Sequence, residues 1–276
     1  MDKRIHGLYG LKFNPFAPDV PTEALFVDAR TEIFCQRVRQ LTADGGFALV
    51  TGDPGTGKSA ILRILTRELG QMRDVSVGMI SRPQASIPDF YREIGEHFTV
   101  DLKPHNRWAG SKALRDKWKN HIMGTLSRPV LIIDEAQELK SPVLSELRLL
   151  ASSNLDSYNL LTIVLAGDIS LIDRLRTEFI PLDSRIRVRL QLERRDPEDL
   201  SLCLKTLLEQ AGAPQLMTPE VINTIADHAM GNLRSLMIMA DNLLSAAVRR
   251  EVRTIDEKLF FEVCTEATTK KAQRRR

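Results

Sequence analysis

The sequence predicts an α/β fold, in which helices cover both faces of a parallel β-sheet, followed by a small C-terminal helical domain. Two observations lead to this prediction. Apolar runs alternate with helical patterns through the first two thirds of the chain, and after about residue 193 only helical patterns remain. Runs with little polar alternation are typical of strands buried on both faces. These runs are FALVT (47–51), VSVGMIS (75–81), PVLIID (129–134), LLTIVLAG (160–167) and IRVRLQL (186–192).

Capping residues mark the helix boundaries. Ser86 precedes Pro88 at the start of one helical pattern, and Gly70 ends the helix that follows the first strand. In the C-terminal part, N-caps are expected at Asp196, Thr218 and Asn232. The expected domains are an α/β nucleotide-binding domain (1–193), a helical lid domain (194–268) and a basic tail (269–276). The tail KKAQRRR is too polar to pack, and we expect it to be disordered.

Composition is that of an ordinary globular protein. The 276 residues are 43% hydrophobic and 27% charged, and the net charge of +3 permits a polyanionic partner without requiring one. The three cysteines are scattered, without the spacing of a disulfide framework or a zinc site. The sequence has no apolar run of about 18 residues and no secretory leader pattern. We therefore expect a cytoplasmic protein with reduced thiols and no membrane segment.

The stretch TGDPGTGKSA carries a phosphate-binding signature. Gly52 to Ser59 satisfies G-x-x-x-x-G-K-[ST] directly between a predicted strand and a predicted helix. Its backbone N–H groups would cradle phosphates, Lys58 would reach the β- and γ-phosphates, and the Ser59 hydroxyl would ligate Mg²⁺. The expected cofactors are ATP and Mg²⁺. The predicted nucleotide-binding residues of this loop are Gly52, Asp53, Pro54, Gly55, Thr56, Gly57, Lys58, Ser59 and Ala60.

A second acidic motif completes the prediction of an ATP hydrolase. In VLIIDEAQ, Asp134 and Glu135 follow a buried strand at the end where open α/β sheets bind ligands. Asp134 would hold the Mg²⁺ shell, and Glu135 would orient and deprotonate the attacking water. With Lys58 and Ser59 they form the predicted catalytic and metal-binding centre.

Three further residues are candidates for the same site, each with a simpler alternative. Asp168, at a strand tip, would contact the γ-phosphate or be a plain turn residue. Arg185 would supply an arginine finger to the nucleotide of an adjacent subunit, or form surface ion pairs. Arg234 would fold onto the γ-phosphate, or lie in solvent at a helix start.

In this order the motifs GDPGTGKS, VLIIDEAQEL, ELRLLASSNLDSYNLLTIVLAGDISL, LDSRIRVRLQL and GNLRSL, preceded by YGLKFNPFAPD, resemble the ExeA-like group of AAA+ ATPases over nearly the whole chain. The resemblance implies sensor 1 at Asp168, the finger at Arg185 and sensor 2 at Arg234. It also implies adenine contacts from Asn14, Pro15 and Phe16. At the position of Asp168 the family commonly carries an amide, and an ionised acid there cannot donate a hydrogen bond to the γ-phosphate.

Short members of this group resemble the helper ATPases of DNA transposition, the MuB, TniB and TnsC type. This resemblance implies a homo-oligomer, either ring or helical filament, that assembles on double-stranded DNA with ATP and activates a transposase. Hydrolysis would be slow alone and stimulated by a partner. The candidate DNA contacts, mostly sequence-independent, are Arg82, Gln84, Lys103, His105, Asn106, Arg107 and Lys112. For any one of these residues, a place in a solvated basic loop is the alternative, whereas the two loops taken together favour DNA binding.

Two rival functions remain open. One is a secretion-associated ATPase at the cell envelope without a DNA role. The other is a replication-initiator or loader-type AAA+ protein, for which the residues after Glu193 leave little room for both a lid and a DNA-reading module. The tail would bind DNA or an acidic partner, or only keep the protein soluble.

Overall fold

The computed structural model divides into two compact units. The α/β unit comprises Val27–Pro54 and Lys58–Leu192, and the helical unit comprises Met1–Phe26, Gly55–Gly57 and Glu193–Arg276. The structure describes residues 3–81, 83, 86–99, 113, 116–117, 120–121, 124, 128–153, 158–159 and 161–273. The strands end near residue 193, as the sequence indicates. The N-terminal segment groups with the helical unit, whereas the sequence-based division placed it with the α/β domain.

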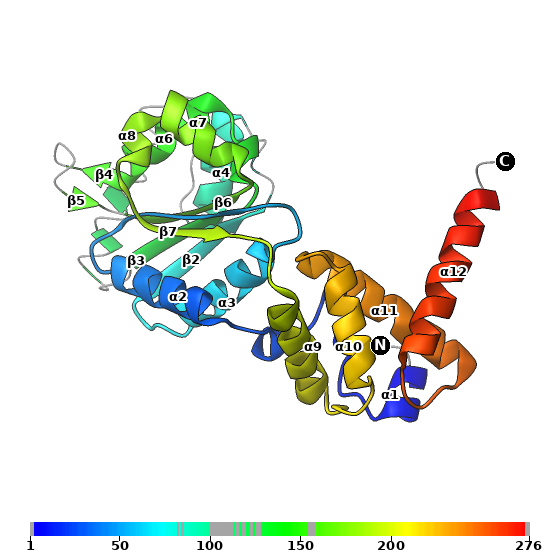
Figure 1. Ribbon diagram of the computed structural model, residues 1–276. Helices are drawn as coiled ribbons and strands as arrows, with labels where there is room; N and C mark the ends of the chain where they lie inside the picture. Colours follow the sequence, from blue (N-terminus) through cyan, green and yellow to red (C-terminus); the bar gives the residue numbers. More distant parts are fainter. Residues whose placement is uncertain are drawn as a thin grey trace. The chain divides into compact units, whose positions relative to one another are not determined.

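The α/β unit is built on a five-stranded parallel sheet with the order β2-β3-β6-β1-β7 (Figure 1). The five predicted strands are therefore confirmed. Their bounds are β1 (Gly46–Gly52), β2 (Val75–Ile80), β3 (Arg128–Ile133), β6 (Thr162–Gly167) and β7 (Ile186–Leu192). Because β6 lies between β1 and β3, the strands that carry the two predicted nucleotide motifs are not neighbours in the sheet.

Helices cover both faces of this sheet, which gives the predicted three layers. In Figure 1, α2 and α3 lie on one face, and α4, α6, α7 and α8 lie on the other. Alternate strand residues such as Leu49, Leu131 and Ile163 pack into the core beneath the second group, all at 2% exposure or less. The helix bounds are α2 (Ala29–Leu41), α3 (Lys58–Gly70), α4 (Ile87–His97), α6 (Ser141–Ala151), α7 (Ser170–Glu178) and α8 (Ile180–Asp183), with a 3-10 turn η2 (Ala136–Glu138) after β3.

A small antiparallel pair was not predicted. It consists of β4 (Ser152–Ser153) and β5 (Tyr158–Asn159), paired Ser152 to Asn159. Two-residue strands are too short for any alternation of apolar and polar residues to reveal them.

The helical unit surrounds its own core. The elements are α1 (Lys3–Tyr9), the 3-10 turn η1 (Thr22–Ala24), α9 (Pro197–Ala211), α10 (Pro219–His228), α11 (Leu233–Arg250) and α12 (Glu257–Gln273). The N-terminal segment joins this core through Leu11 and Phe16, which are buried with Leu204, Ile225 and Leu243. Burial of these apolar side chains is what holds the first 26 residues to the helical unit rather than to the sheet.

The predicted caps are confirmed. Ser86, Thr218 and Asn232 each accept a backbone N–H three residues further on, and Asp196 is the N-cap of α9. The prediction of a disordered tail from residue 269 is wrong for 269–273, since α12 continues through Gln273. Alanine, lysine and glutamine are good helix formers, and this propensity outweighed the polarity of the segment. Within the described part of the chain, no helix has both the length and the apolar character needed to cross a membrane.

Candidate nucleotide site

The carboxyl edge of the sheet gathers the predicted nucleotide motifs. The strand registers pair Thr51 with Gly167 and Ile133 with Leu165, so β1, β3 and β6 end at nearly the same level. The residues that follow these strands are the phosphate loop, the acidic pair and Asp168. Neighbouring parallel strands thus bring together three segments that are far apart in the sequence.

The loop after β1 has the backbone of a phosphate cradle. Gly55 and Gly57 adopt φ values of +87° and +110°, which glycine reaches without the strain that a Cβ would cause. Lys58 begins α3 and is only 7% exposed, and its Nζ donates to the carbonyl oxygens of Gly52 (2.7 Å) and Asp53 (3.2 Å). The buried ammonium group of Lys58 is therefore held by backbone carbonyl oxygens of the phosphate loop.

Gly55 contacts the start of α11 within the helical unit. The Arg234 N–H donates to the Gly55 carbonyl at 3.2 Å, and a Cβ built on Gly55 would lie 2.4 Å from Asn232 Oδ1. Because the Asn232 amide also caps α11, it has little freedom to move away. Arg234 has an exposed side chain at this helix start. The segment predicted to carry sensor 2 is thus in contact with the middle of the phosphate loop.

Asp134 lies half-buried directly after β3, with its Oδ1 accepting the Glu135 N–H at 2.9 Å. Burial raises the pKa of its carboxyl group, and the negative charge of Glu135 adds to this. The Glu135 N–H, the Lys58 ammonium and a hydrogen bond from Ser59 act in the opposite direction. Ser59 and Asp134 therefore place a hydroxyl and a carboxylate side by side. Such hard oxygen ligands fit Mg²⁺.

Glu135 is exposed and takes a left-handed backbone conformation (φ +51°, ψ +41°) immediately before η2. Its Oε2 accepts a hydrogen bond from Gln137 Nε2 at 2.5 Å. Gln137 belongs to the DEAQ stretch, but the sequence alone predicts no role for it. Its polar character two positions after Glu135 is the one signal that the sequence offers.

Asp168 makes contacts typical of a helix start. Its Oδ1 accepts the Ser170 N–H at 2.9 Å and the Ser170 hydroxyl at 2.5 Å, at the beginning of α7. Its own N–H donates to Gln137 Oε1 at 3.2 Å. The turn role that the sequence left open is therefore present, and the sensor role stays a prediction.

The remaining predicted residues lie in different parts of the molecule. Arg185, half-buried before β7, donates from Nη1 to the Pro181 carbonyl at 2.5 Å. In the helical unit, Asn14 Nδ2 donates to Asp241 Oδ1 at 2.8 Å, and Phe16 is 3% exposed beside the buried Pro15. The predicted DNA contacts lie outside the described residues: Arg82, Gln84, Lys103, His105, Asn106, Arg107 and Lys112.

This parallel sheet, with a phosphate loop after β1 and an acidic pair after β3, has the α/β P-loop AAA+ fold. Residues 41–175 match the family described as AAA domain. The chain is 31% identical over 248 residues to General secretion pathway protein A of Aeromonas hydrophila. The match covers 88% of this chain, which spans 44% of the length of that relative.

Solved structures share the fold at low sequence identity. The Aeropyrum pernix ORC2 protein superposes with a TM-score of 0.71 at 15% identity, over 92% of this chain and 71% of that chain. The Aeropyrum pernix ORC1 protein in complex with DNA gives 0.67 at 19% identity, over 92% and 68%. The RuvB Holliday junction branch migration motor of Thermotoga maritima gives 0.58 at 15% identity, over 90% and 72%. These matches support the AAA+ part of the resemblance seen in the motifs.

Proposed function

We propose that this chain is an AAA+ ATP hydrolase that binds ATP·Mg²⁺ at the carboxyl edge of its sheet. The observation that carries the proposal is the placement of the Ser59 hydroxyl beside the Asp134 carboxylate, close to Lys58 and Glu135. The hydroxyl comes from the first turn of α3 and the carboxylate from the end of β3, where the loop N–H groups would hold phosphates.

The chain's own residues divide the work of hydrolysis. Lys58 would place positive charge on the β- and γ-phosphates, and Ser59 and Asp134 would hold the ion. When bound, Mg²⁺ neutralises charge that develops on the phosphate oxygens. Glu135 would accept a proton from the attacking water through a carboxylate oxygen. The segment Asn14, Pro15 and Phe16 is proposed to line the adenine.

We also propose that the site is completed by a second copy of the chain. Arg185 would reach the nucleotide of the neighbouring subunit, while Asp168 and Arg234 would sense the γ-phosphate. The support is chemical: a planar, permanently charged guanidinium suits a transferring phosphoryl group. An isolated subunit would then hydrolyse ATP slowly, and a DNA or protein partner that promotes assembly would accelerate it.

The client in this proposal is double-stranded DNA, on which ATP would assemble the oligomer and recruit a transposase. The resemblance to transposition helper ATPases and the basic residues Arg82, Lys103, Arg107 and Lys112 support it. Solved structures of the same fold include Drosophila ORC bound to DNA. The ring or filament geometry depends on a rotation between subunits that no motif encodes.

A second candidate is a secretion-associated ATPase that acts on a protein complex. The 31% identity to General secretion pathway protein A favours it. An initiator or loader role would agree equally with the fold shared with the ORC proteins. The secretion-associated candidate differs from the first because it predicts no ATP-dependent binding to DNA.

The test combines two variants with a DNA mobility shift. Lys58→Ala should abolish nucleotide binding and ATP-dependent assembly, whereas Glu135→Gln should keep binding and prolong the assembled state. The DNA shift should require a slowly hydrolysed ATP analogue and weaken steeply as salt rises. Equal behaviour of the two variants would refute the role of Glu135. Absence of an ATP-dependent shift at low salt would leave the secretion-associated function as the better candidate.

A further inference from the structure

Gln137 connects the acidic motif after β3 with the tip of β6. Its Nε2 donates to Glu135 Oε2 at 2.5 Å, and its Oε1 accepts the Asp168 N–H at 3.2 Å. The nitrogen of this side-chain amide thus bonds the carboxylate of the proposed base, and its oxygen bonds the backbone N–H that follows the neighbouring strand β6. We infer that Gln137 is a positioning residue that holds the Glu135 carboxylate in the orientation needed to activate water.

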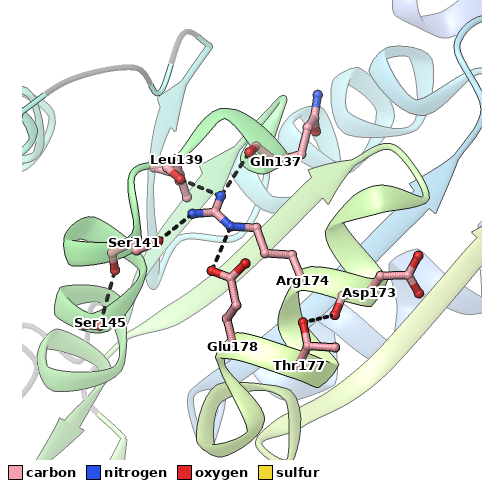
Figure 2. A network of polar contacts seen from close by, with 8 residues as sticks. All are labelled: Gln137, Leu139, Ser141, Ser145, Asp173, Arg174, Thr177 and Glu178. Atoms are coloured by element: carbon pink, nitrogen blue, oxygen red, sulfur yellow. Dashed lines mark hydrogen bonds and ion pairs between the residues drawn. The ribbon is translucent and has the colours of Figure 1, made fainter.

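The backbone of Gln137 is fixed independently of its side chain. Arg174 Nη1 donates to the carbonyl oxygens of Gln137 (3.0 Å) and Leu139 (2.6 Å), and Nη2 donates to Ser141 Oγ at 3.0 Å. Arg174 Nε lies 3.6 Å from Glu178 Oε2. In Figure 2 the carbonyl of Gln137 faces the guanidinium while its side chain points away. The turn η2 is therefore anchored to α7 by one cation, which leaves the Gln137 amide free to serve Glu135.

The close approach of Gln137 to β6 requires a residue without a side chain. A Cβ built on Gly167 would lie 2.6 Å from Gln137 Oε1 and 2.8 Å from Leu171 Cδ2. Real Cβ atoms do not approach other atoms so closely, so Gly167 keeps open the space that the amide occupies. The position of the Gln137 amide therefore depends on glycine at position 167.

The chemistry explains what this arrangement would achieve. A carboxylate offers about four lone-pair sites on two oxygens, so a bond from Gln137 to Oε2 leaves Oε1 able to accept a proton from water. The bond also restricts an exposed side chain that would otherwise sample several rotamers. Because a general base must lie within hydrogen-bonding reach of its proton, orientation here controls the rate.

The inference rests on the proposed ATP hydrolysis, and Gln137→Leu tests it. Loss of both hydrogen bonds should lower kcat by roughly 10- to 100-fold, the range for a misplacement of about 1 Å. Affinity for a fluorescent ATP analogue should stay unchanged, because the hydrogen bonds of Gln137 within the described residues join Glu135, Asp168 and Arg174 rather than the phosphate loop. Gln137→Glu, which keeps an acceptor for the Asp168 N–H but has no amide donor, should show the same loss. Glu138→Gln, an exposed change in the same turn, is the matched control and should keep wild-type kcat.

A double variant separates positioning from a structural role. In a Glu135→Gln background, Gln137→Leu should cause no further loss, since its effect passes through the Glu135 carboxylate. An additional loss of the same factor would overturn the inference, as would wild-type kcat in a folded Gln137→Leu protein. A wild-type chain that binds ATP but never hydrolyses it would instead refute the proposed function, and the inference with it. Thermal unfolding of each variant identifies any that fails to fold.

Discussion

The hydroxyl of Ser59 lies beside the carboxylate of Asp134 and acts to lower the pKa of that acid. Ser59 lies in the first turn of α3 and Asp134 directly follows β3, so this contact joins the two motifs on which the proposed function depends. Burial has the larger, opposite effect, and the net pKa of Asp134 is raised.

The first prediction concerns the charge of Asp134. Its pKa is raised in the folded state, so the folded protein binds the proton more tightly than the unfolded chain. The free energy of unfolding therefore falls as pH rises from the ordinary aspartate pKa through the raised value, and it remains lowered at neutral pH. Asp134→Asn should consequently raise the melting temperature at pH 7 while removing the extra stabilisation by Mg²⁺ with an ATP analogue.

Differential scanning fluorimetry with and without that ligand pair checks this prediction. Asp173→Asn, an exposed acid on α7, is a control that should change neither quantity. A melting temperature of Asp134→Asn below that of the wild type would contradict the sign of the effect.

The second prediction concerns the anchor formed by Arg174. Its guanidinium, with the side chain 20% exposed, donates to three oxygens of η2 and the following residues (Figure 2). Arg174→Met keeps much of the apolar stem but removes every donor, so it should lower the free energy of unfolding by about 1–3 kcal/mol. Urea unfolding measures this value. The exposed neighbour on the same helix provides the comparison: Arg176→Met should stay within about 0.5 kcal/mol of the wild type.

The third prediction tests whether Arg185 acts across subunits. Lys58→Ala and Arg185→Ala should each be inactive in hydrolysis when assayed alone. Mixed in equal amounts, they should regain activity, because about a quarter of random interfaces would join an intact Lys58 to an intact Arg185. No recovery in a mixture that demonstrably co-assembles would place the arginine's role within its own subunit.

The fourth prediction uses the cysteines. Cys35 and Cys203 are buried, and burial raises the pKa of each thiol to about 12, whereas Cys264 is exposed on α12. Because the thiolate is the reacting species, only Cys264 should be alkylated in the native protein at pH 8. Mass spectrometry should find one modified thiol before unfolding and three after it. In Cys264→Ser, no thiol should be alkylated before unfolding. Rapid alkylation of two thiols in the native wild type would contradict the prediction, because it would show that a buried cysteine becomes accessible.

Local patterns were enough to predict most of the fold. The apolar runs placed all five strands of the parallel sheet, and Ser86, Thr218 and Asn232 placed helix starts, because caps and strand burial are written in neighbouring residues. The grouping of the N-terminal segment with the helical unit depends on packing of Phe16 against residues far along the chain, which no local pattern records.

The residues of the candidate site likewise include some that local sequence spacing reveals and some that it does not. Gly52 to Ser59 and Asp134 could be found by spacing alone, since loop, strand and helix follow one another in sequence. The partnership of Gln137 with Asp168 could not, because it depends on β6 lying beside β3. Once that strand order is known, an amide after one strand end and a backbone N–H after the next are natural partners.

The outer strand β7 has a consequence for assembly. It lies at one edge of the five-stranded sheet, and its exposed positions include Arg187 and Arg189. An edge strand offers unpaired backbone groups to any other strand, but joining two copies there would bring like charges together. The positive charge at this edge, above all that of Arg187, thus acts against strand pairing between two copies of the chain and against amyloid-like growth.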